Sequence, residues 1–264
     1  MTTDSRLRLV HLFPVLMGTY GDGGNIDVLV YRAQARGLDS EVVTVGPEDA
    51  IPGQADLYLL GGGEDAGQMV AAQRLSQSEA FNQACAAGAT ILAICAGLQV
   101  LGQSFEVAGG QIQPGVGLLD AVTRRRQPRA VGEVIAEPLG GLDWPYLTGY
   151  ENHGGGTTLG EAATPLARVT SGIGNGIPGP QGQAWEGAIQ GHIMATYLHG
   201  PVLARNPAMA DHLLTWATGL EIAPLEAPLV EQLRAERLAY ATSGKLSAEA
   251  AATAKRRRWP RNKT

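Results

Sequence analysis

The segment Thr90-Ile-Leu-Ala-Ile-Cys-Ala-Gly-Leu-Gln-Val-Leu-Gly102 joins an apolar strand pattern to a helical pattern of small residues, with no loop between them. The junction falls at Cys95, which Ala96 and Gly97 follow. A turn this sharp strains its central residue, lifts the side chain above the sheet edge and aims the next amide at the same place. The pattern predicts a nucleophile elbow at Cys95. The alternative is a buried structural thiol, since unpaired cysteine is among the most buried residue types.

Composition limits the classes of protein to consider. The chain has 264 residues, of which 44% are hydrophobic, so it can bury a sizeable core in one large α/β domain or in a domain with extensions. Its 36 glycines against 3 phenylalanines indicate many tight turns. The net charge of −5 argues against nucleic acid as the main partner. No apolar run reaches the roughly 18 residues that a transmembrane helix needs, so none is predicted.

The cysteine count indicates the redox setting. Cys85 and Cys95 are the two cysteines, too few for a disulfide framework, and the N-terminal stretch lacks the basic and then apolar pattern of a signal peptide. We therefore expect a reducing, cytoplasmic location, where a free thiol stays reactive.

Short apolar strands alternate with amphipathic helices along the chain, which predicts an α/β fold with a mostly parallel sheet flanked by helices. The predicted strands are 8–13, 41–45, 56–60, 90–95 and 196–199, and the predicted helices are 26–36, 68–75, 79–87 and 207–218. The Gly-rich and β-branched region 109–160 indicates hairpin or irregular strands, with 131–136 the clearest.

The C-terminal part differs in composition. We place one domain at residues 1–222 and a partly helical tail, rich in Ala, Glu and Arg, at 223–264. The tail ends in the basic run Lys255-Arg-Arg-Arg-Trp-Pro-Arg-Asn-Lys263. We interpret this run as a solvated terminus and not as a nucleic-acid or membrane contact, because nothing else in the chain builds a basic face.

A thiol at an elbow needs a base, because the thiolate is the nucleophile. His199 ends a predicted strand and precedes Gly200-Pro201, which places its imidazole at the carboxyl edge of the sheet, together with Cys95. His153, in the Gly-rich stretch Glu151-Asn-His-Gly-Gly-Gly156, is the rival candidate, in a tightly turned loop that can tie it to a backbone group. The other histidines receive no role: His11 in a strand, His192 before one and His212 in a helix.

The reaction also needs hydrogen-bond donors that stabilise the negative charge developing on the substrate oxygen. Gly61-Gly62-Gly63 follows a predicted strand, where bare amides can approach a substrate, and the amide of Ala96 would complete an oxyanion hole. Taken alone, the three glycines indicate an ordinary strand-to-helix loop. A Walker phosphate loop is excluded because no Gly-Lys-Ser/Thr follows.

Taken together, the Gly-Gly-Gly loop, the elbow Cys95-Ala-Gly-Leu-Gln99 and the strand-end histidine resemble the class I glutamine amidotransferases. Three further stretches resemble the cobyric-acid-synthase-like branch of that class, and in particular its GatD-type glutaminase subunits of lipid II isoglutaminyl synthase. They are Thr196-Tyr-Leu-His-Gly-Pro201, Gly149-Tyr-Glu-Asn-His-Gly-Gly155 and Tyr20-Gly-Asp-Gly-Gly-Asn25. The resemblance spans about residues 8 to 220 and implies the flavodoxin-like architecture of the class.

The resemblance also implies roles for individual residues. Cys95 would be the nucleophile, His199 the general base and acid, and Gly62, Gly63 and Ala96 the oxyanion hole. Arg129, in Arg129-Ala-Val-Gly-Glu133, would grip the substrate carboxylate bidentately, with Gln99 also at the substrate. No metal or cofactor is implied. We interpret Arg124, Arg125 and Arg126 as solvated.

One position departs from the wider class, in which a glutamate two residues after the histidine orients it. Here that position is Pro201, so the third catalytic residue is missing or comes from elsewhere in the chain. A Cys-His dyad is chemically feasible, because thiol and imidazole can share a proton without an acid that fixes the tautomer.

The implied activity is hydrolysis of L-glutamine to glutamate and ammonia. Because the sequence shows no ATP-binding motif, ammonia would pass to a separate synthetase. The resemblance implies a MurT-like partner of the Mur-ligase family in a heterodimer, which amidates the α-carboxylate of D-glutamate in lipid II during peptidoglycan synthesis. Two alternatives remain: a glutaminase for another acceptor, such as a cobyrinic acid amide, and a noncatalytic elbow-cysteine protein that binds without reacting.

Overall fold

A computed structural model describes residues 6–242 of the chain. Its contacts divide the chain into one unit that ends at Glu226 and a second that begins at Ala227. The boundary that the sequence places at 222/223 remains a prediction, and the basic run at the C-terminus lies outside the described residues.

The first unit contains a six-stranded sheet in the order β11-β12-β4-β3-β1-β2. All its neighbouring strands are parallel except β11 and β12, which pair antiparallel, so the predicted mostly parallel sheet is confirmed. Near-continuous apolar runs form β3 and β4, and both are buried along their whole length, as expected for strands covered on two faces. The strands are β1 (Leu7–Leu12), β2 (Ser40–Val45), β3 (Leu57–Leu60), β4 (Thr90–Ile94), β11 (Ala188–Gln190) and β12 (Ile193–Thr196).

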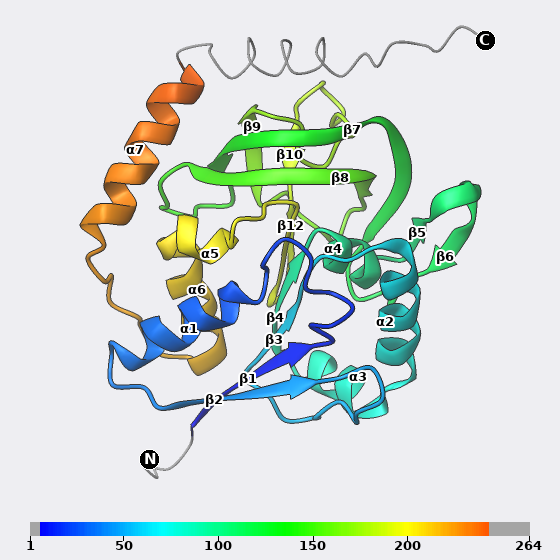
Figure 1. Cartoon of the computed structure of the whole chain (residues 1–264), viewed down its shortest axis with the longest axis horizontal. Coiled ribbons are helices and arrows are strands. Elements are labelled where there is room, and N and C mark those ends of the chain that lie inside the picture. Colours follow the sequence, from blue (N-terminus) through cyan, green and yellow to red (C-terminus); the bar gives the residue numbers. More distant parts are fainter. Residues whose placement is uncertain (1–5, 243–264) are drawn as a thin grey trace, which may run out of the picture. The chain divides into compact units, whose positions relative to one another are not determined.

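Helices flank this sheet in two groups (Figure 1). On one side α1 packs against α5 and α6, and on the other α2 packs against α3 and α4. The N-cap Ser78 accepts a hydrogen bond from the Phe81 amide at the start of α3, and Gly219, with φ of 67°, ends α6. The helices are α1 (Gly24–Gln34), α2 (Asp65–Gln77), α3 (Glu79–Ala86), α4 (Ala96–Leu101), α5 (Val202–Arg205) and α6 (Pro207–Thr218).

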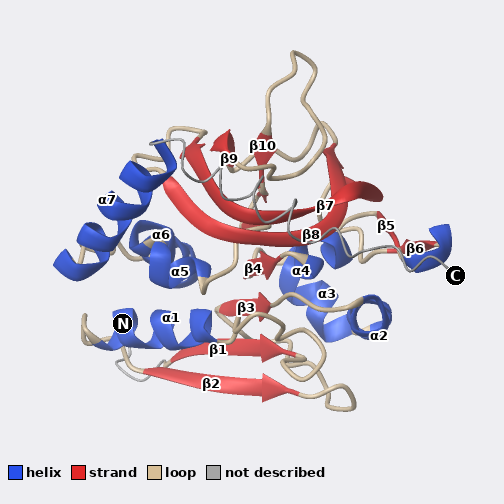
Figure 2. Cartoon of the chain, turned by 45° about the horizontal axis from the view of Figure 1, so that its top comes forward, coloured by secondary structure: helices blue, strands red, loops and turns tan. Residues whose placement is uncertain are grey.

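A second sheet follows the order β10-β9-β7-β5-β6, with β8 paired to β7. The region predicted as hairpin or irregular strands forms here two long antiparallel strands of 18 and 13 residues, which Figure 2 shows curving side by side. Their register shifts between Arg125 and Ala130. The elements are β5 (Ser104–Glu106), the short 3₁₀ helix η1 (Ala108–Gly110), β6 (Ile112–Pro114), β7 (Ala121–Pro138), β8 (Leu147–Leu159), β9 (Ala167–Ser171) and β10 (Trp185–Glu186).

The strand predicted at 196–199 is misplaced. β12 ends at Thr196, and His199 instead forms an isolated bridge with Tyr150 of β8. The reason is the hydrogen bonding of the backbone: the Tyr197 amide donates to the Glu186 carboxylate and the Leu198 amide to the Thr196 hydroxyl. The Thr-Tyr-Leu pattern is typical of a strand, but the Tyr197 and Leu198 amides donate to side chains and not to a neighbouring strand.

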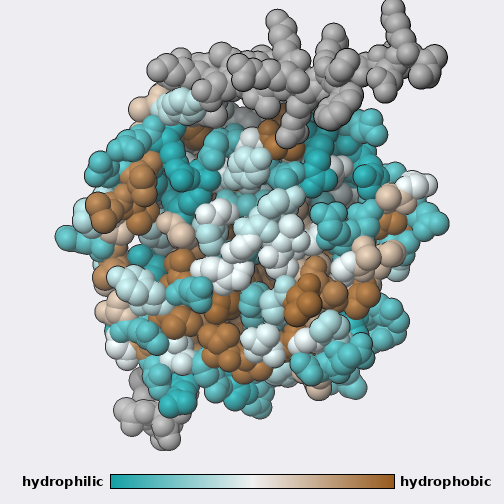
Figure 3. Space-filling model, viewed as in Figure 1, coloured by the Kyte–Doolittle hydropathy of each residue, from teal (hydrophilic) through white to brown (hydrophobic). Residues whose placement is uncertain are grey.

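The second unit contains one described helix, α7 (Pro228–Thr242), in which Glu231 and Arg234 form an i,i+3 ion pair of 3.4 Å. Among the described residues no helix combines the length and apolar character that crossing a membrane requires. On the face drawn in Figure 3, apolar side chains lie in several groups separated by polar ones.

Candidate active site

The strand-to-helix turn is as sharp as the sequence predicts. β4 ends at Ile94 and α4 begins at Ala96, which leaves only Cys95 between them, with φ of 52° and ψ of −105°. A methyl group on Gly97 would lie 2.5 Å from the Leu60 carbonyl oxygen, so this position has room only for glycine. Cys95 is 7% exposed and lines a cavity. The thiol is therefore shielded from bulk water but accessible from that cavity.

His199 lies beside Cys95. Its Nδ1 donates to Oδ1 of Asp22 at 2.9 Å, which leaves Nε2 to face the thiol. Nε2 forms no hydrogen bond of standard geometry with the described residues, yet Cys95 is near enough to affect the imidazole. Burial by itself lowers the pKa of His199. The hydrogen bonds and charges of Asp22 and Cys95 outweigh that effect and raise the pKa to about 10. The imidazole beside the thiol therefore keeps its proton at neutral pH.

Asp22 is the residue that the sequence analysis did not assign. It is fully buried, and its second oxygen, Oδ2, accepts the Gly62 amide at 2.8 Å. Tyr20 and Gly21 adopt positive φ of 64° and 76°, a tight turn that directs the chain into Asp22 just before α1. The only sequence signal is the stretch Tyr20-Gly-Asp-Gly-Gly-Asn25. The site therefore holds a Cys-His-Asp arrangement and not the dyad that Pro201 implied.

Gly62 lies against both catalytic candidates. A methyl group on it would be 3.0 Å from Cε1 of His199 and 3.5 Å from Cβ of Cys95. Because its amide already donates to Asp22, the expected role of Gly62 as an oxyanion donor is not supported by this geometry. The amides of Gly63 and Ala96 donate to no other group in the described part of the chain. Ala96 is the first residue of α4, where an amide has no intrahelical acceptor.

The cavity above Cys95 has a volume of about 270 Å³ and a strongly charged lining. Arg125 and Arg129 are its cations, and Glu64, Asp65 and Glu106 are its carboxylates. Asp65 pairs with Arg125 at 3.3 Å, and Glu106 accepts the Arg125 amide. Glu64, at the N-terminus of α2, makes no side-chain hydrogen bond there. The interpretation of Arg125 as merely solvated is thus incomplete, since it lines the cavity.

Arg129 is held by its neighbours in a fixed orientation. Its Nε donates to Oδ1 of Asn152 at 2.6 Å, and Nη2 donates to the Asn152 carbonyl at 2.9 Å. Asn152 in turn donates to the Tyr20 hydroxyl at 2.7 Å, and the Tyr20 ring packs edge-on against His199 with centroids 4.9 Å apart. Arg129 lines the cavity, and the contacts that hold it extend through Asn152 and Tyr20 to His199.

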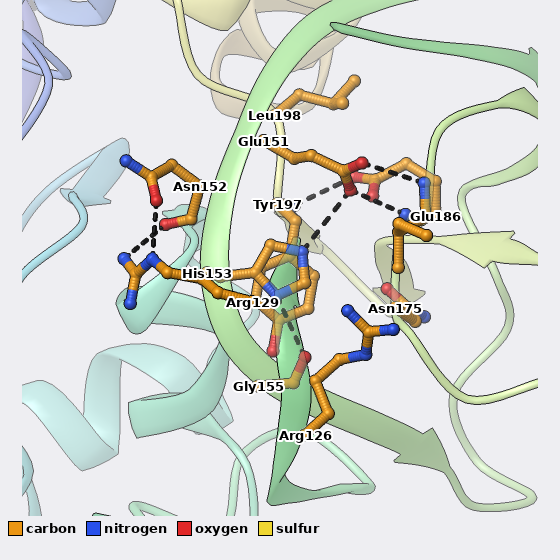
Figure 4. A network of polar contacts seen from close by, with 12 residues as sticks. Arg126, Arg129, Glu151, Asn152, His153, Gly155, Asn175, Glu186, Tyr197 and Leu198 are labelled. Carbon is orange, nitrogen blue, oxygen red and sulfur yellow. Dashed lines mark hydrogen bonds and ion pairs between the residues drawn. The ribbon is translucent and has the colours of Figure 1, made fainter. Parts of the chain in front are cut away.

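The rival histidine, His153, is a structural part of the cavity wall. Its Nδ1 bonds the Gly155 carbonyl at 2.9 Å, as its Gly-rich surroundings suggested, and its ring stacks on Tyr197 at 3.8 Å (Figure 4). Gln99, 7% exposed, also lines the cavity, and its Nε2 donates to the Tyr197 hydroxyl at 3.2 Å. The other ring nitrogen of His153, Nε2, lies 3.5 Å from the Glu151 carboxylate, so the contacts of both nitrogens belong to the wall and not to Cys95.

Comparison with known proteins places this site in a family. The model of the CobB/CobQ-like glutamine amidotransferase domain matches residues 8–207. The chain belongs to this family. Two curated relatives are the GatD subunits of lipid II isoglutaminyl synthase (glutamine-hydrolyzing). The Streptococcus pneumoniae protein is 34% identical, with 80% of each chain covered, and the Staphylococcus aureus protein is 32% identical, with 83% of this chain and 88% of that one covered.

This amidotransferase also resembles longer relatives and solved structures. The probable cobyric acid synthase of Methanopyrus kandleri is 31% identical over 74% of this chain but only 40% of its own. A Thermotoga maritima glutamine amidotransferase structure superimposes with a TM-score of 0.52 at 16% identity, over 82% of this chain and 84% of that one. At this identity the structural match supports the α/β fold of the family, in agreement with the fold that the sequence predicts.

Proposed function

We propose that this amidotransferase is a glutaminase subunit that hydrolyses L-glutamine to glutamate and ammonia, with Cys95 as nucleophile, His199 as general base and acid, and Asp22 as the residue that orients His199. The observation that carries the proposal is the placement of the Cys95 thiol between a charged cavity and an imidazole whose other nitrogen is bonded to a buried carboxylate. This is the arrangement that nucleophilic attack on a carboxamide requires.

The reaction follows from these positions. The Cys95 thiolate attacks the side-chain carbonyl carbon of glutamine, and the oxyanion that forms is stabilised by the amides of Gly63 and Ala96. His199 gives its proton to the amide nitrogen, the C–N bond breaks, and ammonia leaves a thioester on Cys95. Water then attacks the thioester while His199 takes one of its protons. The C–S bond breaks, glutamate is released and the thiolate is restored.

Substrate recognition would use the charged ends of the cavity. Nη1 of Arg129 suits the α-carboxylate of glutamine. Glu64, which lines the cavity and whose side chain does not cap α2, suits the α-ammonium group. Gln99, on the wall beside Cys95, would contact the body of the substrate. A ligand with both charges and a terminal carboxamide is an amino acid amide such as glutamine.

For the acceptor we propose the D-glutamate α-carboxylate of lipid II, amidated by a MurT-like synthetase of the Mur-ligase family that binds this chain as a heterodimer. The support is the similarity to two GatD subunits over most of their length, compared with 40% of the length of the cobyric acid synthase relative. Amidation of a cobyrinic acid is the competing assignment.

The test begins with the purified full chain, alone and with a co-expressed Mur-ligase-like synthetase. Glutamate release from glutamine is expected in at least one preparation, and Cys95→Ala should abolish it while the protein still folds. A thiol-alkylating glutamine analogue should label Cys95 stoichiometrically. Absence of hydrolysis and labelling in both preparations would favour a noncatalytic binding protein. Hydrolysis without lipid II amidation by the complex would overturn only the acceptor assignment.

A further inference from the structure

The sheet holds the backbone that leads to His199 only as far as Thr196. The Cys95 amide donates to the Thr196 carbonyl at 2.7 Å, the last ladder contact between the elbow and β12. His199 lies three residues beyond that contact. The path of these residues therefore sets where the imidazole lies relative to the thiol.

A buried carboxylate guides that path. Oε1 of Glu186, in β10, accepts the Tyr197 amide at 2.9 Å and also the Thr196 hydroxyl. The Thr196 hydroxyl accepts the Leu198 amide at 3.0 Å. The His199 amide then reaches the Tyr150 carbonyl of β8 at 2.8 Å. Each amide that leaves the ladder thus finds an acceptor, and two of the three depend on Glu186 and Thr196.

The single proton of the Thr196 hydroxyl determines which of its bonds it donates and which it accepts. A hydroxyl has one proton, and that of Thr196 goes to Glu186, so its oxygen is free to accept Leu198. Glu186 is fully buried, and burial raises its pKa to about 7, although the bonds from Thr196 and Tyr197 oppose that rise. A buried carboxyl group with one oxygen lacking any partner in the described part of the chain is costly. An apolar residue would fill this space at lower cost, but it would leave the Tyr197 and Leu198 turn without its acceptors.

The same turn also positions Tyr197, which supports residues of the cavity wall. The Tyr197 ring lies against His153 (Figure 4). Its hydroxyl bonds the side chains of Gln99 and, at 2.6 Å, Thr157. Gln99 and His153 both line the cavity. The turn after β12 thus sends Tyr197 behind the substrate cavity and His199 toward Cys95.

We infer that Glu186 and Thr196 are positioning residues, which hold the turn after β12 so that His199 meets Cys95. The inference rests on the proposed glutaminase function for its kinetic readout. Thr196→Val has nearly the same shape but loses both hydroxyl bonds, and Thr196→Ser restores them. Thr90→Val is the matched control, because Thr90 is an equally buried strand threonine whose hydroxyl has no partner among the described residues.

In the full chain, or its complex if the complex is the active form, Thr196→Val should lower kcat for glutamine at least about tenfold with KM changed less than about twofold. Thr196→Ser should recover kcat to within about threefold, and Thr90→Val should keep it. Glu186→Gln, which retains the acceptor oxygen, should outperform Glu186→Leu. A normal kcat in Thr196→Val would overturn the inference, as would an equal loss in Thr90→Val.

Alkylation of Cys95 by iodoacetamide at pH 7 separates this inference from the proposed function, because it needs no glutamine. Thr196→Val should slow alkylation severalfold relative to wild type and Thr90→Val, with all three assayed well below their melting temperatures. If the wild type fails to hydrolyse glutamine, the proposed function falls, and the alkylation rates still decide the positioning role. Equal alkylation rates in all three would refute it.

Discussion

The Nδ1 atom of His199 lies 2.9 Å from Oδ1 of Asp22, although 177 residues separate them in the chain. Both side chains are almost completely buried, and Asp22 also accepts the Gly62 amide. One carboxylate therefore orients the His199 imidazole and fixes the glycine loop beside the thiol. In the proposed mechanism Asp22 is the third catalytic residue, in place of the glutamate for which this chain has Pro201.

Asp22→Asn should keep the shape of the site but weaken its function. The amide cannot support the imidazolium and can hold the wrong tautomer, so kcat should fall roughly 10³-fold or more while KM for glutamine changes little. Steady-state glutamate release measures both constants. Asp27→Asn, an exposed substitution in the first turn of α1, is the control and should behave as wild type. Equal activity of Asp22→Asn and the control would contradict the triad.

The raised pKa of His199 predicts a pH dependence of stability. The native state keeps a proton on His199 up to about pH 10, whereas the unfolded chain releases it near pH 6.5. The stabilisation is complete below pH 6.5 and is lost as the pH rises toward 10, by at most about 1.4 kcal/mol per pH unit. The difference in free energy of unfolding between wild type and Asp22→Asn should shrink over that range. Denaturant melts at several pH values measure it, and a difference that grows with pH would refute the assignment.

Arg129→Lys should impair binding of glutamine more than chemistry. A lysine cannot reproduce the two bonds to Asn152 and still present a planar group to a carboxylate. We expect KM to rise about 10- to 100-fold with kcat within about threefold. Arg126→Lys, outside the cavity lining, serves as the control and should leave KM unchanged. A drop in kcat alone would place Arg129 in another role.

Glu64→Gln tests whether Glu64 binds the α-ammonium group of glutamine. Removing the negative charge while keeping the side-chain size should raise KM for glutamine about tenfold, because a partly exposed ion pair with the substrate is lost. Glu48→Gln changes an exposed carboxylate elsewhere and should have no effect. The two variants should differ little for a glutamine analogue that keeps the carboxylate but lacks the α-ammonium group. An unchanged KM in Glu64→Gln would assign the ammonium group to another acceptor.

Short sequence patterns predicted those features of the fold and site that depend on neighbouring residues in the chain. The strand-to-helix change at Cys95 predicts the elbow, and the alternation of apolar strands with amphipathic helices predicts the mostly parallel sheet. The Gly-rich setting of His153 predicts its bond to a backbone carbonyl. Prediction failed at 196–199, because the Tyr197 amide bonds a carboxylate from β10 and not a neighbouring strand.

By itself, the sequence predicted the elbow at Cys95, because a short run of residues encodes a strained turn and its small neighbours. It also predicted His199 as the partner histidine and the resemblance to the family from further short motifs. Only the tertiary structure showed that Asp22 contacts His199 and that the Gly62 amide is already paired. Asp22 lies in the stretch Tyr20-Gly-Asp-Gly-Gly-Asn25, which carries the family resemblance but assigned no role to this carboxylate, and its contacts form because the fold brings that loop beside His199 and Gly62. The same carboxylate accepts the Gly62 amide, so the oxyanion donors that we propose are the amides of Gly63 and Ala96.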